Sequence, residues 1–287
     1  MKQYIKLMRP FHWIKNLLLF VPLFFNGTLN DTNKFANVVI GFVAFSLIAS
    51  SVYVLNDIQD VDKDRQHPKK RFRPIASGAI SVSHAKCFWL FLVIISLLLM
   101  YFVGYRCENY WIAYSMPILY LIMNIGYSEG LKNIPLFDVI IIALGFVIRL
   151  FYGGMIVNVS ISSALFLTVV SVSLFLGFGK RRNELQKGTK TRKVLQAYNI
   201  GFLDKIMYVC ITLSLVFYAL WTLESHSRLL VYTVPVAMII VMDYCLIIES
   251  DSSDGDPAEV LKHSKSLSIL LFVFIVMVFI SIYIIHI

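Results

Sequence analysis

Long apolar runs constrain the fold of this chain more than any other feature of its sequence. Hydrophobic residues make up 58% of the 287 residues and charged residues 15%, and the apolar stretches are too long for the core of a soluble domain. A helix that crosses about 30 Å of hydrocarbon needs roughly 20 mostly apolar residues. Nine stretches meet or approach this length, at residues 17–29, 36–55, 85–104, 110–126, 135–156, 162–179, 201–222, 229–248 and 267–286.

The first of these stretches is short and would have to begin near Pro10 to cross a membrane. The stretches are continuous and lack the alternation of apolar and polar residues that is typical of outer-membrane β-barrels. The sequence therefore predicts an all-α integral membrane protein, a bundle of nine transmembrane helices that forms a single polytopic domain over residues 1–287.

Lysine and arginine are distributed unevenly between the loops on the two sides of this predicted bundle. If the N-terminus is cytosolic, the cytosolic segments contain nineteen of them and the external segments only Lys34, Arg106 and Arg228. Positive residues favour the cytosolic side, so we expect a cytoplasmic N-terminus and a C-terminal Ile287 outside the cell membrane. The same bias accounts for most of the net charge of +9, and nucleic acid is not an expected partner.

The cysteines and histidines show no metal-binding spacing. Cys87, Cys107, Cys210 and Cys245 form no CxxC pair, and the six histidines form no HxxxH pattern. We interpret the cysteines as small apolar side chains, not as disulfides or zinc ligands.

Acidic residues gather where the second predicted span ends. The segment Asn56-Asp57-Ile58-Gln59-Asp60-Val61-Asp62-Lys63-Asp64 directly follows a long apolar run. If the helix continues through it, Asp57, Asp60 and Asp64 lie at i, i+3 and i+7 on one face. Mg²⁺ takes one or two carboxylates and keeps its other positions for water and substrate phosphates. The segment therefore predicts an enzyme with a Mg²⁺–diphosphate site in the cytosol.

A basic run follows the aspartates in the same cytosolic loop, which is expected at residues 56–84. The run reads Lys69-Lys70-Arg71-Phe72-Arg73-Pro74. Guanidinium groups bind phosphate oxygens as a bidentate fork, and ammonium groups bind them as a point charge. We interpret Arg71 and Arg73 as diphosphate ligands. For Lys69 and Lys70, contact with anionic lipid headgroups is an equal alternative.

A second charged loop is expected at residues 180–200. It opens with Gly179-Lys180-Arg181-Arg182-Asn183-Glu184-Leu185, and on a continuing helix Lys180 and Glu184 share a face. The alternative is a surface ion pair at a helix end, which contributes little. Because this loop lies at the matching end of another span, we favour a functional role. The acidic stretch from Ser250 to Asp256 is expected to be a solvated link between the last two spans.

Three smaller polar groups lie in or next to the spans. Lys15 and Asn16 lie deeper in the first span than interfacial anchors usually do. The turn from Tyr127 to Lys132 carries a lone cation, which could serve only as a topology signal. Asp138 and Arg149 lie within the fifth span, about 16 Å apart along a helix, so we expect no direct pairing. An ionisable group within a span usually faces a polar cavity, and structural packing is an equal alternative for Arg149.

Together these segments resemble a known family. The pattern Asn-Asp-x-x-Asp-x-x-x-Asp at residues 56–64 resembles the first aspartate-rich motif of the UbiA superfamily of intramembrane prenyltransferases. Over essentially the whole chain, the closest likeness is to its decaprenyl-phosphate phosphoribosyltransferase branch. Four further motifs carry it: Arg9-Pro10-x-x-Trp13-x-Lys15-Asn16, Arg71-x-Arg73-Pro74-Ile75-x-x-Gly78, Tyr127-Ser128-x-x-Leu131-Lys132 and Gly179-Lys180-Arg181-x-x-Glu184-Leu185.

The resemblance implies a UbiA-like bundle with a cytosol-facing active-site cavity. Typical members carry a second Asp-x-x-x-Asp motif that helps to bind Mg²⁺ on a prenyl diphosphate, whereas this chain has Lys180-Arg181-Arg182-Asn183-Glu184 there. A cation cannot hold a second Mg²⁺, but it can hold a lipid phosphate. The resemblance therefore implies a transferase that moves 5-phosphoribosyl from phosphoribosyl diphosphate to a membrane polyprenyl phosphate.

The first loop would then bind the donor. We expect Asp57 and Asp60, with Asp64 directly or through water, to hold Mg²⁺ on the donor diphosphate. Either Arg71 or Arg73 would neutralise the charge that builds on the departing pyrophosphate.

The acceptor phosphate is expected to bind Lys180, Arg181 or Lys132, with Lys180 as a catalytic cation. Lys15 and Asn16 are expected to steady the donor phosphate from the first span. The other substrate-binding residues that the motifs imply are Asn56, Tyr127 and Glu184.

Two other functions remain as alternatives. A prenyltransferase that uses an aromatic or quinone acceptor would share the fold and the metal, but the altered second motif argues against it. A transporter could use the membrane carboxylates and Arg149, yet the aspartates lie at the surface and not at the midplane, where transporter sites usually lie. The prenyl chain length cannot be read from the sequence, and self-association into a homo-oligomer is left open.

Overall fold

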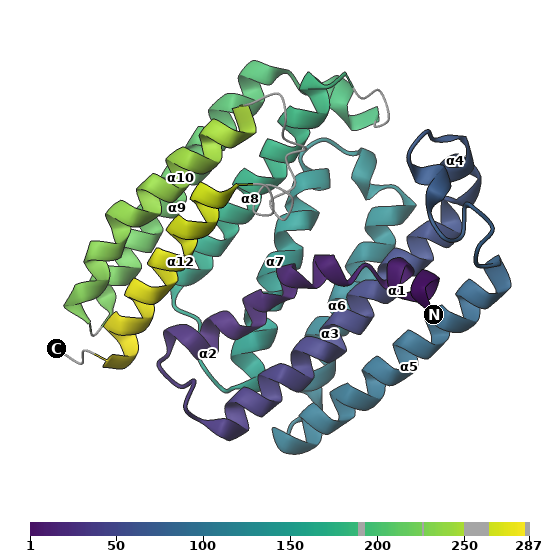
Figure 1. Ribbon diagram of the computed structural model, residues 1–287. Helices are drawn as coiled ribbons and strands as arrows, with labels where there is room; N and C mark the ends of the chain where they lie inside the picture. Colours follow the sequence, from purple (N-terminus) through teal and green to yellow (C-terminus); the bar gives the residue numbers. More distant parts are fainter. Residues whose placement is uncertain (189–192, 226, 250–263, 285–287) are drawn as a thin grey trace. The chain divides into compact units, whose positions relative to one another are not determined.

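The computed structural model describes residues 1–188, 193–225, 227–249 and 264–284 (Figure 1). Every regular element within these ranges is a helix, which confirms the predicted all-α class. Several residues of the sequence analysis lie outside the described ranges: the acidic stretch from Ser250 to Asp256, Ile287, and three of the nineteen cations expected in the cytosol, Lys190, Arg192 and Lys262.

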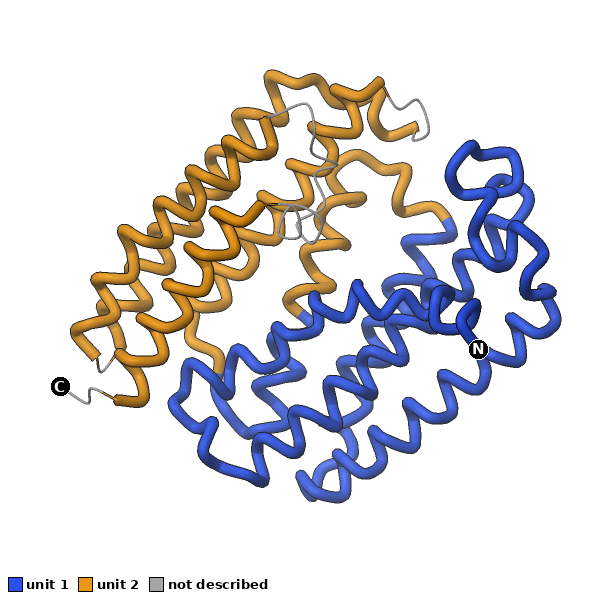
Figure 2. The backbone as a smooth tube through the Cα atoms, viewed as in Figure 1, with its two compact units in different colours: residues 1–129, 148–160 blue, residues 130–147, 161–287 orange. Residues whose placement is uncertain are grey.

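The chain forms two compact units (Figure 2). Unit 1 comprises Met1–Glu129 and Ile148–Ser160, and unit 2 comprises Gly130–Val147 and Ile161–Ile287. The division falls within helix α7 (Phe137–Ile156), whose first half belongs to unit 2 and whose second half belongs to unit 1. The single domain expected from the sequence stays a prediction.

Unit 1 consists of helices and their connections. Besides the second half of α7, its elements are α1 (Lys2–Met8), the 3₁₀ helix η1 (Pro10–Phe20), α2 (Val21–Phe25), α3 (Thr32–Gln59), α4 (Val61–Gln66), the 3₁₀ turn η2 (Lys70–Phe72), α5 (Val82–Arg106) and α6 (Tyr110–Glu129).

Helix α3 is the longest element of unit 1, and its ends are defined by polar residues. The carboxylate of Asp31 caps its N-terminus by accepting hydrogen bonds from the backbone N–H groups of Asn33 and Lys34, at 3.0 Å each. At 1.5 Å per residue its 28 residues extend about 42 Å, longer than the roughly 30 Å of a hydrocarbon core. The last turns of α3 can therefore carry carboxylates outside the hydrocarbon.

Aromatic packing forms the core of unit 1. The ring of Phe45 lies 4.9 Å from that of Tyr120 and 5.8 Å from that of Tyr152, measured between centroids. Next to Tyr152, Gly153 lets the second half of α7 approach η1 closely, because a Cβ at this position would lie 2.2 Å from the backbone oxygen of Leu19. Glycine is thus required at residue 153 for the backbone packing of unit 1.

Unit 2 also consists of helices and their connections. Besides the first half of α7, its elements are the 3₁₀ turn η3 (Leu131–Asn133), α8 (Ser163–Gln186), the 3₁₀ helix η4 (Lys193–Ala197), α9 (Ile200–Glu224), the 3₁₀ turn η5 (Arg228–Tyr232), α10 (Thr233–Glu249), α12 (Lys265–Phe279) and the π-helical η6 (Ile280–Ile284).

Side-chain caps fix where the long helices of unit 2 begin. Ser162, Asn199 and Ser264 each accept a hydrogen bond from the backbone N–H three residues ahead, at 3.2, 2.8 and 3.2 Å. Such caps satisfy backbone donors that the first turn of a helix leaves without intrahelical partners.

Seven helical segments of the described chain are long and apolar enough to span a membrane. They are Thr32–Gln59, Val82–Arg106, Phe137–Ile156, Ser163–Gln186, Ile200–Glu224, Arg228–Glu249 and Lys265–Ile284. Two other predicted spans correspond to the shorter apolar segment Pro10–Phe25, which begins at Pro10 as expected, and to α6. The count of nine spans and the cytosol-facing cavity stay predictions.

Large apolar side chains cover the outer faces of these helices. Leu246 on α10 is 71% exposed and Phe272 on α12 is 68% exposed. Contiguous apolar surface of this kind is rare on soluble proteins, and it fits a lipid environment.

Candidate active site

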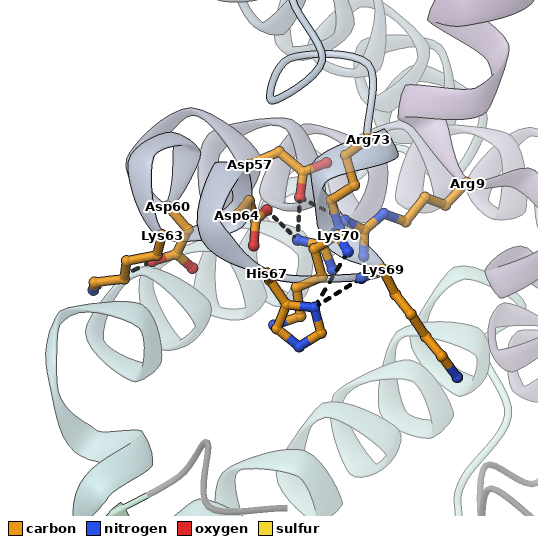
Figure 3. A network of polar contacts seen from close by, with 9 residues as sticks. All are labelled: Arg9, Asp57, Asp60, Lys63, Asp64, His67, Lys69, Lys70 and Arg73. Carbon is orange, nitrogen blue, oxygen red and sulfur yellow. Dashed lines mark hydrogen bonds and ion pairs between the residues drawn. The ribbon is translucent and has the colours of Figure 1, made fainter.

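The end of α3 carries a cluster of two carboxylates and two guanidinium groups, which we call the aspartate–arginine cluster: Arg9, Asp57, Asp64 and Arg73 (Figure 3). Asp57 Oδ1 accepts hydrogen bonds from Arg9 Nη2 at 2.5 Å and from Arg73 Nη1 at 3.1 Å. The same Arg73 Nη1 donates to Asp64 Oδ2 at 2.6 Å. Both carboxylates thus converge on one cationic nitrogen.

The backbone after α3 explains why two aspartates converge. Helix α3 ends at Gln59 and α4 begins at Val61, so the helix does not run unbroken through the acidic segment. Helical hydrogen bonding nevertheless continues, because the N–H of Asp60 donates to the oxygen of Asn56 at 2.9 Å and the N–H of Asp64 to that of Asp60 at 2.8 Å.

Asp60 does not take part in this convergence. Its nearest cation is Lys63, with 3.5 Å between Lys63 Nζ and Asp60 Oδ1, and Figure 3 shows this pair apart from Asp57 and Asp64. The Asp60 side chain is 35% exposed, whereas Asp57 and Asp64 are buried. The structure therefore brings together two of the three aspartates that the spacing placed on one face.

The two arginines reach the cluster from opposite directions along the chain. Arg73 precedes Pro74 and has the extended conformation that this position favours, with φ −66° and ψ 148°. Arg9 terminates α1 in the left-handed region, with φ 53° and ψ 58°. The two side chains remain 24% and 29% exposed, for Arg9 and Arg73 respectively.

The carboxylates of the aspartate–arginine cluster fit a divalent cation that takes few protein ligands and is otherwise coordinated by water and substrate phosphate. Within the described ranges, no three His, Cys, Asp or Glu side chains are close enough together to hold a metal ion. Mg²⁺ commonly binds proteins through one or two carboxylates and fills its other positions with water and substrate phosphate. Asp57 and Asp64, whose carboxylates both accept from Arg73 Nη1, are the pair of oxygen ligands that could hold such an ion.

The other residues of unit 1 that we expected to bind the donor substrate lie near the end of α3 or in the 3₁₀ elements η1 and η2. Asn56 Oδ1 accepts a hydrogen bond from Ser128 Oγ at 2.6 Å, which ties the end of α3 to the end of α6, next to Tyr127. The guanidinium of Arg71 lies over the Phe72 ring, 4.9 Å from its centroid. Lys15 is half-buried in η1.

Asn16 lies in the interior of unit 1. It is 1% exposed, its amide donates to Ser46 Oγ at 2.9 Å, and its Oδ1 accepts from Arg149 Nε at 2.7 Å. Arg149 also donates to Tyr120 Oη at 3.2 Å and lies over the rings of Phe45 and Tyr120. These contacts favour structural packing for Arg149, and they explain Asn16 without a donor phosphate.

Unit 2 contains a second group of charged residues, which we call the buried ion cluster: Asp138, Arg181, Glu184 and Tyr198. Arg181 Nε donates to Asp138 Oδ2 at 2.5 Å, and both side chains are 0% exposed. Arg181 Nη1 donates to Glu184 Oε2 at 2.9 Å. Asp138 lies in the first turn of α7, where the helix dipole favours a negative charge.

Tyr198 joins this cluster from the segment before α9. Its hydroxyl donates to Asp138 Oδ1 and accepts from the backbone N–H of Leu136, both at 2.7 Å. Burial raises the pKa of Tyr198 to about 12, and the hydrogen bond to Asp138 acts in the same direction. The hydroxyl therefore stays protonated and bridges the start of α7 to the chain that leads into α9.

The expected absence of a direct pair between Asp138 and Arg149 is confirmed. Each has its own partners, in unit 2 and in unit 1 respectively. Arg181, in contrast, lies in a buried ion pair and not on an open surface.

The remaining basic residues of the second loop differ in their environments. Arg182 pairs with Asp204 of α9 and donates to Gln186 Oε1 at 3.2 Å. Lys180 is half-buried at the end of α8, and Lys132 is half-buried in η3. Their binding of an acceptor phosphate stays a prediction.

Arg9 and Tyr198 belong to these clusters, although sequence spacing did not assign them there. Arg9 lies 48 residues from Asp57, and Tyr198 lies 60 from Asp138. No local periodicity connects residues so far apart. Of the two, only Arg9 had a signal in the sequence, because it belongs to the motif that begins at Arg9-Pro10.

Comparison with protein families places the chain in a well-defined group. Residues 18–266 match the model of the UbiA prenyltransferase family. A decaprenyl-phosphate phosphoribosyltransferase of Mycolicibacterium smegmatis is 33% identical over 93% of this chain and 88% of its own length. A protein of the same description from Corynebacterium glutamicum is 30% identical over 98% of this chain and 86% of its own length.

Solved structures give the same fold. A UbiA homolog from Archaeoglobus fulgidus, solved bound to GPP and Mg²⁺, superposes with a TM-score of 0.72 over 98% of this chain and 99% of that chain, at 20% identity. At this identity the likeness concerns the fold.

Proposed function

Because the chain belongs to the UbiA prenyltransferase family, we propose that it transfers the 5-phosphoribosyl group from phosphoribosyl diphosphate to a membrane polyprenyl phosphate and releases diphosphate. The observation that carries this proposal is the similarity, over 93% and 98% of the chain, to two relatives described as decaprenyl-phosphate phosphoribosyltransferases. The chain is thus a multi-pass membrane transferase.

The charges of the second loop support the same choice of substrates. Arg181 and Arg182 follow Lys180 directly at the end of α8, and no aspartate lies between Lys180 and Glu184. Such a segment suits the phosphate of a lipid acceptor better than a second metal ion.

Unit 1 would bind the donor. We assign the diphosphate to Arg9 and Arg73, and the carboxylates of Asp57 and Asp64 would hold Mg²⁺. When bound, Mg²⁺ would supply Lewis-acid neutralisation of the departing diphosphate. The exposed fractions of the two arginines leave their guanidinium groups within reach of phosphate oxygens.

Unit 2 would bind the acceptor. We assign its phosphate to Lys180 and Lys132. The contacts of Arg181 with Asp138 and Glu184 support a different role for Arg181, that of a positioning residue for the end of α8. Glu184 would support this role, because it accepts a second hydrogen bond from Arg181.

The transfer step needs few groups. A phosphate oxygen of the acceptor attacks the anomeric carbon of the donor and forms the new C–O bond, while the bond to diphosphate breaks and diphosphate leaves with its electron pair. A phosphate monoester is largely ionised at neutral pH, so the step needs no general base. The arginines of the aspartate–arginine cluster would stabilise the charge that develops on the leaving group.

The proposal places both charged loops on the cytoplasmic face. The bias of lysine and arginine toward these loops supports a cytoplasmic N-terminus. Phosphoribosyl diphosphate is a soluble, highly charged molecule, so its binding residues need access to an aqueous phase.

The test is a transfer assay with purified full-length protein in detergent. Protein, Mg²⁺, a polyprenyl phosphate and radiolabelled phosphoribosyl diphosphate are incubated, and label in the lipid phase is measured with and without EDTA. We expect Mg²⁺-dependent labelling of the lipid. Labelling that persists in EDTA would overturn the metal assignment and leave the transfer intact.

A prenyltransferase that acts on an aromatic acceptor is the second candidate, because the similar Archaeoglobus fulgidus structures were solved with the prenyl diphosphates GPP and DMAPP. The same preparation is therefore assayed with a prenyl diphosphate and an aromatic acceptor. Product in this assay alone would replace phosphoribosyl transfer with prenyl transfer.

A further inference from the structure

Unit 2 contains an apolar pocket that none of the assigned roles uses. Its volume is about 300 Å³, and it lies among helices α8, α9, α10 and α12. Val172 and Leu176 line it from α8, Ser214 from α9 and Ala237 from α10. This volume is at the lower end of the range for small-molecule sites, which are mostly apolar.

The α8 wall of the pocket continues toward the second charged loop. Thr168, Val172 and Leu176 are spaced by four residues on α8, and the same helical face continues through Gly179 to Asn183. Leu176 and Asn183 are about 10 Å apart along the helix axis. The face that lines the pocket therefore ends beside Lys180 and Arg182.

Gly179 shows that this face meets α9 and α10. A Cβ at Gly179 would lie 3.4 Å from the Met207 Cε of α9 and 3.8 Å from the Ile248 Cδ1 of α10. The pocket and the charged loop are thus connected by one seam between α8, α9 and α10. Met207, a flexible side chain that can repack, lies between them.

At the charged end of this seam, Asn183 has a buried amide without a partner. Asn183 is 4% exposed, and its Nδ2 has no hydrogen-bond partner among the described residues. The adjacent side chains already have partners, since Arg182 pairs with Asp204 and Glu184 accepts a hydrogen bond from Arg181. A buried donor that lacks an acceptor is uncommon in folded proteins and calls for a ligand or water.

We propose that this seam is the acceptor subsite: the pocket holds isoprene units that follow the first unit of the polyprenyl chain, and Asn183 donates a hydrogen bond to the acceptor phosphate. This inference rests on the proposed function. An amphipathic ligand fits the seam because one end is apolar and aromatic-lined and the other carries Asn183 beside the basic residues Lys180–Arg182. A polyprenyl phosphate has this distribution of polarity.

The pocket is tested by filling it. Ala237→Phe adds a ring to the pocket from α10, and Met238→Phe places the same ring next to it on an exposed part of the helix, where Met238 is 42% exposed. We expect Ala237→Phe to raise the KM for a long-chain polyprenyl phosphate about tenfold, a loss of ~1.4 kcal/mol. The KM for phosphoribosyl diphosphate and the rate with dimethylallyl phosphate should stay unchanged, and Met238→Phe should match the original protein.

The same substitutions can overturn the proposal. If Ala237→Phe leaves the KM for the long-chain acceptor unchanged while the protein stays folded, the chain does not bind in this pocket. An equal loss with long-chain acceptor and dimethylallyl phosphate would also contradict the proposal, because only the long chain should reach Ala237.

A crosslinking experiment separates the pocket from the reaction. Full-length protein is irradiated with a polyprenyl phosphate that carries a diazirine on an early isoprene unit, and labelled peptides are mapped. We expect label on the pocket segments of α8, α9 and α10, competed by unlabelled polyprenyl phosphate and reduced in Ala237→Phe. Label there without any phosphoribosyl transfer would support the subsite and reject the proposed reaction. Label elsewhere with normal transfer would reject the subsite alone.

A membrane phospholipid is the competing occupant. If a diazirine phospholipid labels the same segments and polyprenyl phosphate does not displace it, the pocket holds an acyl chain, and the proposal is overturned.

Asn183 is tested with two substitutions. Asn183→Ala removes the amide donor, and Asn183→Asp replaces it with an anion of the same size. We expect the KM for the acceptor to rise about tenfold in Asn183→Ala and further in Asn183→Asp, with the KM for phosphoribosyl diphosphate unchanged and the melting temperature of Asn183→Ala maintained. A lower melting temperature with an unchanged acceptor KM would show that Asn183 is only structural.

Discussion

The two charged clusters of this protein use the same chemical groups in opposite environments. In the aspartate–arginine cluster of unit 1, the side chains of Arg9 and Arg73 are 24% and 29% exposed. In the buried ion cluster of unit 2, Arg181 and Asp138 are 0% exposed. Exposed guanidinium groups can exchange a carboxylate for an incoming phosphate, whereas a fully desolvated pair cannot be separated without a large penalty. The comparison therefore supports the proposed ligand binding by the first cluster and a structural role for the second.

The largest effect is expected from Asp57→Ala in the first cluster. Asp57 accepts from both arginines, and its loss should lower kcat for phosphoribosyl transfer by at least about a hundredfold. Asp62→Ala is the matched control, because the Asp62 side chain is 84% exposed and pairs only with Arg65 at 3.2 Å among the described contacts. The transfer assay measures both, and equal activity of the two variants would contradict the assignment.

The next effect concerns stability in the second cluster. Asp138→Asn removes the fully buried carboxylate and leaves the buried Arg181 charge with only the partly exposed Glu184, so we expect the free energy of unfolding to fall by about 3–5 kcal/mol. Asp204→Asn disrupts the pair with Arg182, in which the Asp204 side chain is 35% exposed. This variant should lower the free energy of unfolding by about 1 kcal/mol or less. Unfolding in detergent micelles measures both differences.

A double substitution sharpens this prediction. Replacing the buried pair with apolar residues, as Asp138→Leu with Arg181→Met, removes both charges together. The double variant should therefore be more stable than either single variant. If it is less stable than both, the cluster stabilises the fold through more than its paired charges.

The third effect separates the two arginines of the basic run. Arg73→Lys keeps the charge but loses the planar guanidinium, whose Nη1 donates to both carboxylates and whose other N–H groups can bind phosphate oxygens in a fork. We expect the KM for phosphoribosyl diphosphate to rise about thirtyfold, which corresponds to ~2 kcal/mol for a charge-assisted hydrogen bond. Arg71→Lys, whose guanidinium lies over Phe72, should raise this KM less. The opposite order would make Arg71 the main diphosphate ligand.

The smallest effect is expected from Tyr198→Phe. It removes one hydrogen bond to Asp138 and one from Leu136, and should lower the free energy of unfolding by about 1 kcal/mol. Because the pKa of Tyr198 is raised to about 12 from an ordinary value near 10, its contribution is complete below pH 10 and is lost as the pH rises through 12. The stability difference between the two proteins should therefore be constant from pH 6 to 9 and should shrink above pH 10.

Much of the fold could be predicted from the sequence, because helical spans are determined by local composition. The apolar runs gave the long helices, and the expected beginning of the first apolar segment at Pro10 agrees with the structure. The convergence of Asp57 and Asp64 also followed from helical spacing. The spacing failed at Asp60, which lies at the break between α3 and α4 and pairs with Lys63 instead.

The roles of the arginines were not predictable in the same way. Arg181 and Arg73 look alike in sequence, since each belongs to a basic run beside a helix end. Their difference depends on their partners: Arg181 donates to Asp138, 43 residues earlier, whereas Arg73 donates to Asp57 and Asp64, 16 and 9 residues earlier. Burial and long-range pairing are properties of the folded unit, so they cannot be read from local spacing.

Gly153 has a consequence for how this protein can tolerate mutation. Even alanine at residue 153 would meet the backbone oxygen of Leu19, and a backbone atom cannot move aside as a side chain can. At Gly41, by contrast, the nearest atom to an added Cβ is the terminal methyl of Ile156, at 2.7 Å, which can rotate away. In a saturation-mutagenesis selection, residue 153 should therefore be depleted of every substitution while residue 41 retains alanine, although neither glycine touches a charged group.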